Sequence, residues 1–199
     1  MRFIVVAPKV SPFVKQLIDF ENTFVIAVDS ALKDLIKNHI HVDAAIGDFD
    51  SLENQSLLEN LPVIKLDPKK DVSDTNYALE YAFGNSEDVI LLGGLFGNRI
   101  DHLYGNLLLL IKYPKLTIID ESNKIKAYGE GIYTFKKDEY DYFSIFALEE
   151  SIISISGAKY PLDNYHLNMS DPLGLSNEIE EELRLTVTKG FVMVIRSKK

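Results

Sequence analysis

The chain has 199 residues, 46% of them hydrophobic, and a formal net charge of -9 at pH 7. It is long enough for one large or two small globular domains, and its acidic charge argues against a nucleic-acid partner, which needs a basic surface. The absence of Cys excludes disulfides, thiolate metal sites and Cys nucleophiles, and without a secretory or membrane-spanning apolar run we expect a cytoplasmic protein with no membrane partner.

The first part of the chain alternates short apolar runs with helical patterns. Strands are expected at 3–7, 24–28, 44–46, 63–66, 89–92 and 116–119. Helices are expected at about 11–20, 30–38, 54–60, 74–83 and 99–111, the first of them opening on a Ser-Pro pair. This alternation predicts an α/β fold with a mostly parallel, Rossmann-like sheet and helices on both faces.

After residue 120 the pattern changes to short strand-like runs separated by turn residues. The runs are 123–128, 132–136, 142–147, 152–156, 165–169, 182–187 and 191–196, which predicts an all-β sandwich or a barrel-like unit. Lys189-Gly190 separates the last two runs, and we expect a closing hairpin there. The boundary falls near residues 121–124, so the expected domains are residues 1–122 and 123–199.

Acidic side chains follow several of the expected strands. Ligands of parallel α/β sheets bind outside the carboxyl ends of the strands, so loops distant in sequence share one rim. The acidic residues on this rim are Asp29, Asp48, Asp50, Asp71, Asp74 and Asp101. An Asp-x-Asp pair such as Asp48 and Asp50 is either a solvated turn or a set of oxygen ligands for a hard divalent cation.

The loop before the expected helix at 74–83 also carries a cationic side chain, Lys70. Lys70 and Asp71 precede this helix start, where a phosphate and its metal can bind. Asp74, taken in isolation, is more simply explained as a helix cap.

Residues 93–102 form a glycine-rich loop that leads into a helix, and glycines let backbone N–H groups approach an anion. Arg99 offers a planar fork of donors for phosphate oxygens, and Asp101 a further cation ligand. The same two side chains are equally consistent with an ion pair on a solvated helix start, and His102 by itself is more often structural.

Four segments together resemble one enzyme family. They are Gly47-Asp48-Phe49-Asp50-Ser51, Lys70-Asp71-Val72-Ser73-Asp74, Gly97-Asn98-Arg99-Ile100-Asp101-His102 with Asn106, and Gly174-Leu175-Ser176-Asn177-Glu178. In this order and spacing they resemble thiamine pyrophosphokinases. The resemblance implies transfer of the β,γ-diphosphate of ATP to thiamine with Mg²⁺ as cofactor, giving thiamine diphosphate and AMP. It also implies a nucleotide-binding α/β domain, a thiamine-binding β-sandwich, and a homodimer that binds thiamine between its subunits.

The resemblance also implies roles for individual residues. The catalytic set is Asp48, Asp50, Asp71, Asp74, Arg99 and Asp101, of which Asp48, Asp50, Asp71 and Asp101 would bind Mg²⁺. The nucleotide-binding set is Asp29, Ser30, Lys70, Asp71, Asp74, Thr75, Gly94, Gly97, Arg99 and His102. The thiamine-binding set is Ser176 and Asn177.

The chain also departs from the family pattern. It has Asp29-Ser30-Ala31 where many relatives have Asp-Gly-Gly, and Asn98 in place of a glycine, so side chains stand where backbone approaches the nucleotide. With no Trp in the chain, an aromatic ring stacked on thiamine would be Tyr or Phe. Three alternatives remain open: a pyrophosphokinase for a pterin-like alcohol, a non-catalytic nucleotide- or thiamine-binding module, and a metal-dependent phosphohydrolase.

Overall fold

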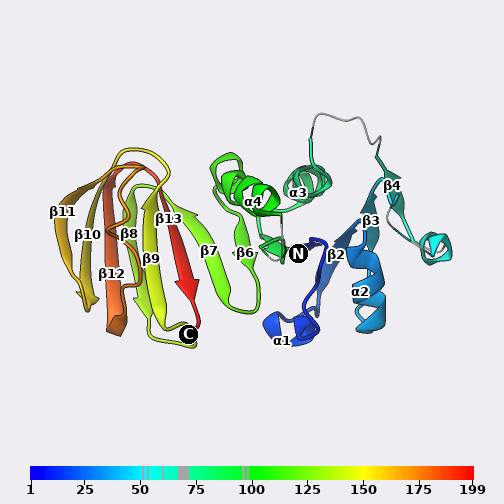
Figure 1. Cartoon of the computed structure of the whole chain (residues 1–199), viewed down its shortest axis with the longest axis horizontal. Helices are drawn as coiled ribbons and strands as arrows, with labels where there is room; N and C mark the ends of the chain where they lie inside the picture. Colours follow the sequence, from blue (N-terminus) through cyan, green and yellow to red (C-terminus); the bar gives the residue numbers. More distant parts are fainter. Residues whose placement is uncertain (51, 53, 60, 67–71, 96, 98) are drawn as a thin grey trace. The chain divides into compact units, whose positions relative to one another are not determined.

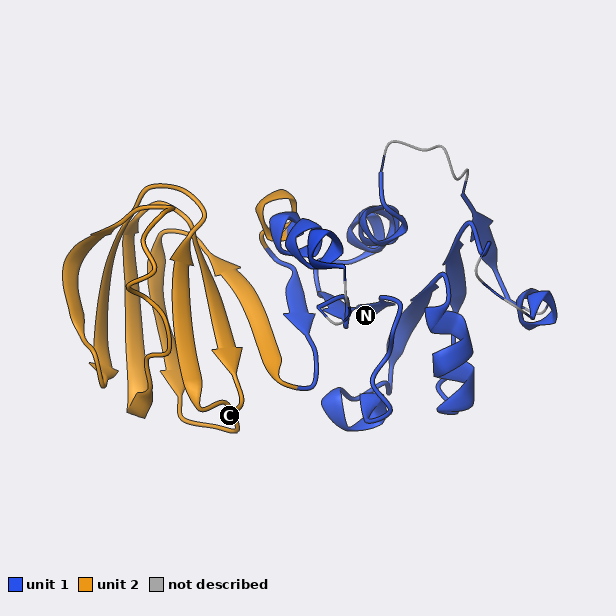
Figure 2. Cartoon of the chain, viewed as in Figure 1, with its two compact units in different colours: residues 1–109, 115–121 blue, residues 110–114, 122–199 orange. Residues whose placement is uncertain are grey.

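The structure is a computed structural model that describes residues 1–50, 52, 54–59, 61–66, 72–95, 97 and 99–199. The chain divides into two compact units (Figure 2). Unit 1 comprises residues 1–109 and 115–121, and unit 2 comprises residues 110–114 and 122–199. Helices and parallel strands build unit 1 and antiparallel strands build unit 2, which confirms the predicted mixed α/β class.

The strands of unit 1 are parallel and follow a spatial order with one reversal. The order is β4 (Val63–Lys65), β3 (Ala44–Gly47), β2 (Thr23–Val28), β1 (Arg2–Val6), β5 (Val89–Leu92) and β6 (Thr117–Ile119). The chain runs outward from β1 to β4 and then returns to the other side of β1. The switch point between β1 and β5 is where sheets of this kind bind ligands.

The helices of unit 1 cover both faces of this sheet. Their bounds are α1 (Val14–Leu17), α2 (Ala31–Lys37), the 3₁₀ turn η1 (Gln55–Leu58), α3 (Asp74–Asn85) and α4 (Ile100–Lys112). Figure 1 shows α3 and α4 over one face and α1 and α2 over the other. None of the helices in the described part of the chain has the length and apolar character needed to span a membrane.

Helix α1 is shorter than the predicted 11–20. The Ser11 hydroxyl accepts a hydrogen bond from the Phe13 N–H (2.9 Å), which competes with a helical first turn. At the other end Ile18 is extended, with φ -156° and ψ 146°. Ile18 also packs against the hydrophobic cluster of this face, so tertiary packing outweighs local helix preference here.

The strands of unit 2 pair antiparallel with one another and belong to two different sheets. They are β7 (Asn123–Tyr128), β8 (Gly131–Lys136), β9 (Tyr142–Ala147), β10 (Ser151–Ala158), β11 (Leu162–Leu167), β12 (Ile179–Lys189) and β13 (Val192–Ser197). β13 pairs with both β7 and β9, and the other sheet has the order β11-β10-β12-β8. Side chains from both sheets, including Phe143, Val194, Ile153 and Leu185, share one hydrophobic cluster.

The closing hairpin predicted at Lys189-Gly190 is wrong. β12 pairs with β10 and β8, whereas β13 pairs with β7 and β9, so the two strands lie in different sheets. Gly190 has φ +97°, and a Cβ there would lie 2.3 Å from the Ser151 Oγ. The Phe191 N–H donates to the same hydroxyl (3.1 Å). The connection is therefore held by the start of β10 and not by pairing between the strands it joins.

Candidate functional site

The Asp-x-Asp loop after β3 is anchored by the residue between its two carboxylates. Phe49 is 1% exposed, belongs to the hydrophobic cluster of unit 1 and has φ +55°. Asp48 is partly buried and Asp50 is exposed, and the Asp50 N–H donates to the Asp48 Oδ1 (3.2 Å). The buried ring therefore holds a tight turn that carries one carboxylate on each side.

Asp29, at the end of β2, lies against this loop. Its Oδ1 accepts a hydrogen bond from the Phe49 N–H (3.2 Å), and its own N–H donates to the Ile46 carbonyl (3.0 Å). Gly47 makes this approach possible, because a Cβ at that position would lie 2.1 Å from the Asp29 Oδ1. The loops after β2 and β3, predicted to share one rim, are thus in direct contact.

A third loop reaches the same carboxylate. The Asp29 carboxyl group is hydrogen-bonded to the side chain of Asp74, the first residue of α3. Burial, this hydrogen bond and the charges of Asp74 and Asp48 raise the pKa of Asp29 to about 7. Ser73 is the N-cap of α3, since its hydroxyl accepts from the Asn76 N–H (3.2 Å). Ser73, and not Asp74 as expected, therefore caps the helix. The carboxyl group of Asp74 contacts that of Asp29 instead.

The chemistry of these donors fits a hard divalent cation. Mg²⁺ in phosphoryl-transfer sites usually binds one or two protein carboxylates and completes its shell with water and substrate phosphates. Asp29 and Asp74 supply such a pair, with Asp48 close enough to raise the pKa of Asp29. Among the described residues, no group of three or more His, Cys, Asp or Glu side chains lies close enough to hold an ion. The pair formed by Asp29 and Asp74 thus fits an ion that is shared with a phosphate.

Arg99 and Asp101, at the start of α4, form an exposed ion pair. Arg99 Nε lies 2.9 Å from Asp101 Oδ1, and Nη2 lies 2.6 Å from Oδ2. The hydrogen bonds from the guanidinium lower the pKa of Asp101 to about 2, and the carboxylate raises the pKa of Arg99. The solvated pair that the sequence offered as an alternative is therefore present in the structure.

A pocket of about 570 Å³ collects many of the predicted nucleotide-binding residues. Its lining includes Asp29, Ser30, Thr75, Gly94, Arg99, Asp101 and His102. Asn106 Nδ2 donates to the Gly94 carbonyl (2.8 Å), and a Cβ on Gly94 would lie 2.6 Å from that nitrogen. Two predicted residues, Lys70 and Asp71, lie outside the described residues. Most of the predicted set thus comes from loops that the fold brings to one pocket.

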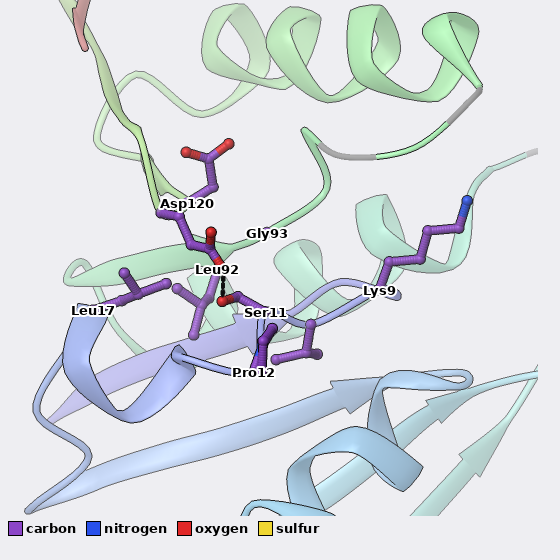
Figure 3. Close-up of a pocket in the computed structure, with 9 residues that line it drawn as sticks. Lys9, Ser11, Pro12, Leu17, Leu92, Gly93 and Asp120 are labelled. Carbon is purple, nitrogen blue, oxygen red and sulfur yellow. Dashed lines mark hydrogen bonds between the residues drawn. The ribbon is translucent and has the colours of Figure 1, made fainter. Parts of the chain in front are cut away.

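Sequence reasoning missed Lys9. It follows β1 with φ +65° and lines this pocket. A Cβ on the exposed Gly97 would lie 2.6 Å from the Lys9 Nζ, so the lysine side chain passes over the glycine-rich loop. In Figure 3, a close-up of a second pocket that Lys9 also lines, this side chain extends away from Ser11 and Pro12. Lys9 follows the central strand β1 and so lies on the same rim as the acidic loops. This position in the sequence could have identified it as a candidate site residue. Lys9 gives the pocket a cationic side chain besides Arg99.

The two predicted thiamine-binding residues lie in unit 2 and differ in character. Asn177 is 7% exposed, its Oδ1 accepts from the Tyr160 and Glu178 N–H groups (3.0 and 2.9 Å), and its Nδ2 donates to the Tyr160 carbonyl (2.8 Å). Ser176 is exposed with φ +54°, and its N–H donates to the Ser144 hydroxyl (3.0 Å). Asn177 therefore orders the loop, and Ser176 is the one of the two that is exposed.

The raised pKa of Asp29 predicts a pH-dependent stability. Between about pH 4 and pH 7 the native carboxyl keeps a proton that the unfolded chain has released, so the free energy of unfolding falls as pH rises through this window. Allowing for solvent screening of a half-exposed group, we expect a fall of about 1–2 kcal/mol. Urea unfolding in a chelator at several pH values measures it. Asp74→Asn removes the neighbouring charge and should flatten the curve; an equal slope in both proteins would contradict this cause.

Both parts of the chain match known proteins. Residues 14–120 match the catalytic domain of thiamin pyrophosphokinase, and residues 132–192 match its vitamin B1 binding domain. The thiamine pyrophosphokinase of Bacillus subtilis (strain 168) is 34% identical over 189 residues, which covers 89% of this chain and 88% of the relative.

Solved structures agree with the sequence matches. The crystal structure of thiamine pyrophosphokinase from Bacillus subtilis superposes with a TM-score of 0.86 at 31% identity and covers 100% of both chains. The structure of thiamin pyrophosphokinase from Geobacillus thermodenitrificans has a TM-score of 0.85 at 30% identity and covers 100% of this chain and 98% of that one. The similarity therefore extends through both units.

Proposed function

The chain belongs to the thiamine pyrophosphokinase family, and from this premise we propose how its own residues act. The enzyme transfers the pyrophosphoryl group of ATP to thiamine and forms thiamine diphosphate. AMP is then the second product, because the β- and γ-phosphates leave together. The structural observation that supports this function is the contact of three acidic loops, through Asp29, Asp74 and the Phe49 turn, beside a pocket that also holds Arg99 and Lys9.

The chemistry is an in-line displacement at the β-phosphorus. The thiamine hydroxyl oxygen forms a bond to that phosphorus, the bond to the α-phosphate oxygen breaks, and a carboxylate of the cluster takes the hydroxyl proton. Catalysis then depends on positioning and on neutralising phosphate charge. Arg99 and Lys70 are proposed to bind phosphate oxygens as AMP departs. The pairing of Arg99 with Asp101 does not oppose this, because an exposed ion pair is weak and exchanges readily.

The proposed Mg²⁺ site combines the predicted ligands with the pair seen in the structure. The predicted ligands are Asp48, Asp50, Asp71 and Asp101, to which the geometry adds Asp29 and Asp74. These residues would hold Mg²⁺, which when bound would supply positive charge to offset that of the triphosphate. The carboxylates would hold the ion, and Phe49 keeps the Asp48–Asp50 turn in place by its burial. Asp74 would exchange its hydrogen bond with Asp29 for the cation.

The two domains are proposed to divide the substrates between them. Residues 1–122 would form the Rossmann-like nucleotide-binding domain, which is supported by the parallel order and its reversal beside β1. Residues 123–199 would form the thiamine-binding β-sandwich, which is supported by antiparallel strands from two sheets whose side chains share one core. Within it, the exposed Ser176 would contact thiamine, and Asn177 would hold the loop that presents it.

We further propose that the enzyme is a cytoplasmic homodimer. Helix α4 exposes apolar side chains three or four positions apart, namely Ile100 (75% exposed), Tyr104 (62%), Leu108 (44%) and Ile111 (49%). A continuous apolar stripe of this kind is typical of a helix that packs against another surface. Light scattering should therefore give about twice the chain mass of 22.5 kDa. A monomeric mass at assay concentrations would exclude the dimer.

Product analysis tests the function directly. The purified protein is incubated with MgATP, with and without thiamine, and the nucleotides and thiamine esters are separated by chromatography. Thiamine-dependent AMP together with thiamine diphosphate is the expected result. ADP with thiamine monophosphate would indicate a simple kinase, and ATP breakdown without thiamine a hydrolase. Turnover with a pterin-like alcohol alone would indicate another acceptor, and binding without turnover a non-catalytic module.

A further inference from the structure

Arg196 is a nearly buried cation at the end of β13, the last strand of unit 2. Its side chain is 12% exposed and pairs with Asp138, which lies in the loop between β8 and β9. The guanidinium carbon lies 5.1 Å from the centre of the Tyr140 ring and 5.9 Å from that of the Phe135 ring. The guanidinium is thus held by one ion pair and by cation–π contacts with two aromatic rings.

This arrangement is costly for a residue that only fills space. The Nε atom of Arg196 is buried and has no hydrogen-bond partner in the described part of the chain. A buried charge offsets the loss of its water only when its remaining donors are also paired, and an apolar side chain would fill the space without that loss. What the guanidinium adds is geometry, since its charge and its plane fix where Asp138 and the rings lie.

Arg196 acts on β9 through strand pairing and through one of these rings. β13 and β9 are antiparallel neighbours, and in their register Arg196 lies opposite Phe143. The Phe135 ring beside the guanidinium packs edge-on against the Phe143 ring, with 5.0 Å between the ring centres. Phe143 is 0% exposed. Because protein interiors are close-packed, such a ring cannot shift without its neighbours.

The other edge of β9 carries the segment that contains Ser176. The Phe143 N–H donates to the Asn177 carbonyl (2.7 Å), and the Asn177 N–H donates to the Phe143 carbonyl (3.0 Å). The Ser176 N–H donates to the hydroxyl of Ser144, the next residue of β9 (3.0 Å). The position of Ser176 is therefore set by the part of β9 that lies opposite Arg196.

We propose that Arg196 is a positioning residue for the thiamine substrate. It acts through Phe143, which holds the edge of β9 that presents Ser176, so that this loop is ordered before thiamine binds. Ordering a binding loop in advance strengthens binding, because less conformational entropy is lost when the ligand arrives. The inference rests on the proposed contact of Ser176 with thiamine, and it adds a residue of another strand on which that contact depends.

The test compares the two substrates in the full-length protein. Arg196→Met keeps an unbranched side chain against the rings and removes the charge. We expect the KM for thiamine to rise at least about 5-fold, with kcat and the KM for ATP within about 2-fold of the wild type. Arg196→Lys keeps the charge without the planar fork and should give a smaller rise of the same kind, which also serves if Arg196→Met does not fold. A rise in the KM for ATP as large as that for thiamine would overturn the inference.

Lys198→Met is the matched control. Lys198 lies 5.5 Å from the centre of the same Tyr140 ring and pairs with Glu139 (2.6 Å). It lies beyond the end of β13 and so outside the register that joins Arg196 to Phe143. Both KM values of this variant should stay within about 2-fold of the wild type. An equal rise in the KM for thiamine in both variants would overturn the inference.

Two further measurements show whether Arg196 acts through the loop. Without substrates, hydrogen exchange of the backbone amides of residues 174–177 should be faster in Arg196→Met than in the wild type and in Lys198→Met. In a Ser176→Ala background, Arg196→Met should raise the KM for thiamine by less than about 2-fold, because the contact it positions is already gone. Unchanged exchange, or independent effects of the two substitutions, would overturn the inference.

Failure of the proposed function would appear in a different experiment. It would show as an absence of thiamine diphosphate in the wild-type assay. The exchange measurement needs neither substrate nor turnover, so it reports on Arg196 and the loop in either case. The two failures are therefore distinguishable.

Discussion

Replacing Asp50 with Asn is expected to lower kcat for thiamine diphosphate formation by at least about 100-fold, because the amide keeps the size of the side chain and removes its charge. The protein should remain folded. Asp50 is exposed, and the turn that carries it is held by the buried ring of Phe49 and by the hydrogen bond from the Asp50 backbone N–H to Asp48. Steady-state kinetics at saturating MgATP and thiamine, with a thermal melt of the same sample, measure both properties.

Asp19→Asn is the matched control for this substitution. Asp19 is also an exposed aspartate in a loop, where it accepts a hydrogen bond from the Glu21 N–H (2.8 Å), but it precedes β2 and so lies at the amino end of the strands. Its turnover should match the wild type within about 2-fold. If Asp50→Asn were as active as this control, the turn after β3 would not belong to the active site.

Gly47→Ala is expected to inactivate the enzyme, although glycine has no side chain that could take part in the reaction. The new Cβ would lie 2.1 Å from the Asp29 Oδ1 and 2.8 Å from its Cγ, so the carboxyl group must leave its position. It would then lose the hydrogen bonds with the Phe49 N–H and with Asp74. We expect kcat/KM to fall by at least about 100-fold, and overpacking to lower the free energy of unfolding by about 1–3 kcal/mol.

The control for this variant is another Gly→Ala change in unit 1. Gly84 lies in α3, and a Cβ there would meet no atom within 4 Å. Gly84→Ala should leave kcat/KM unchanged and stabilise the helix by up to about 1 kcal/mol. Steady-state kinetics give kcat/KM for both variants, and urea unfolding gives their free energies of unfolding. Wild-type activity in Gly47→Ala would show that the position of Asp29 is not needed for catalysis.

The sheet of unit 1 and the rim that carries the candidate site were predictable from local pattern. Strands such as Val89–Leu92 are continuous apolar runs, and this one is buried along its whole length, as expected for a parallel strand covered on both faces. The preference of ligands for the carboxyl ends of such strands then placed Asp29, Asp48 and Asp74 on one rim. The strands and the rim could be predicted without knowing which side chains are in contact.

The contacts themselves were not predictable, because they depend on backbone conformations that residue type does not specify. Asp29 reaches the Phe49 N–H with φ +47°, in a region that aspartate adopts only occasionally, and only because Gly47 carries no side chain. The error at Lys189-Gly190 has a similar origin. A two-residue turn signal describes the bend, but the pairing partners of β12 and β13 are set by residues far away in sequence.

The pairing of β13 has a consequence for synthesis of the chain. Its residues Val192–Ser197 lie between β7 and β9, so the nascent polypeptide cannot complete that sheet until residue 197 has left the ribosome. The strands and helices of unit 1, in contrast, are all present once residue 121 has emerged. Because domains generally fold as units during translation, unit 1 can fold first. Until β13 is synthesised, the edges of β7 and β9 that it will pair with stay unpaired, and such edges can bind chaperones or aggregate.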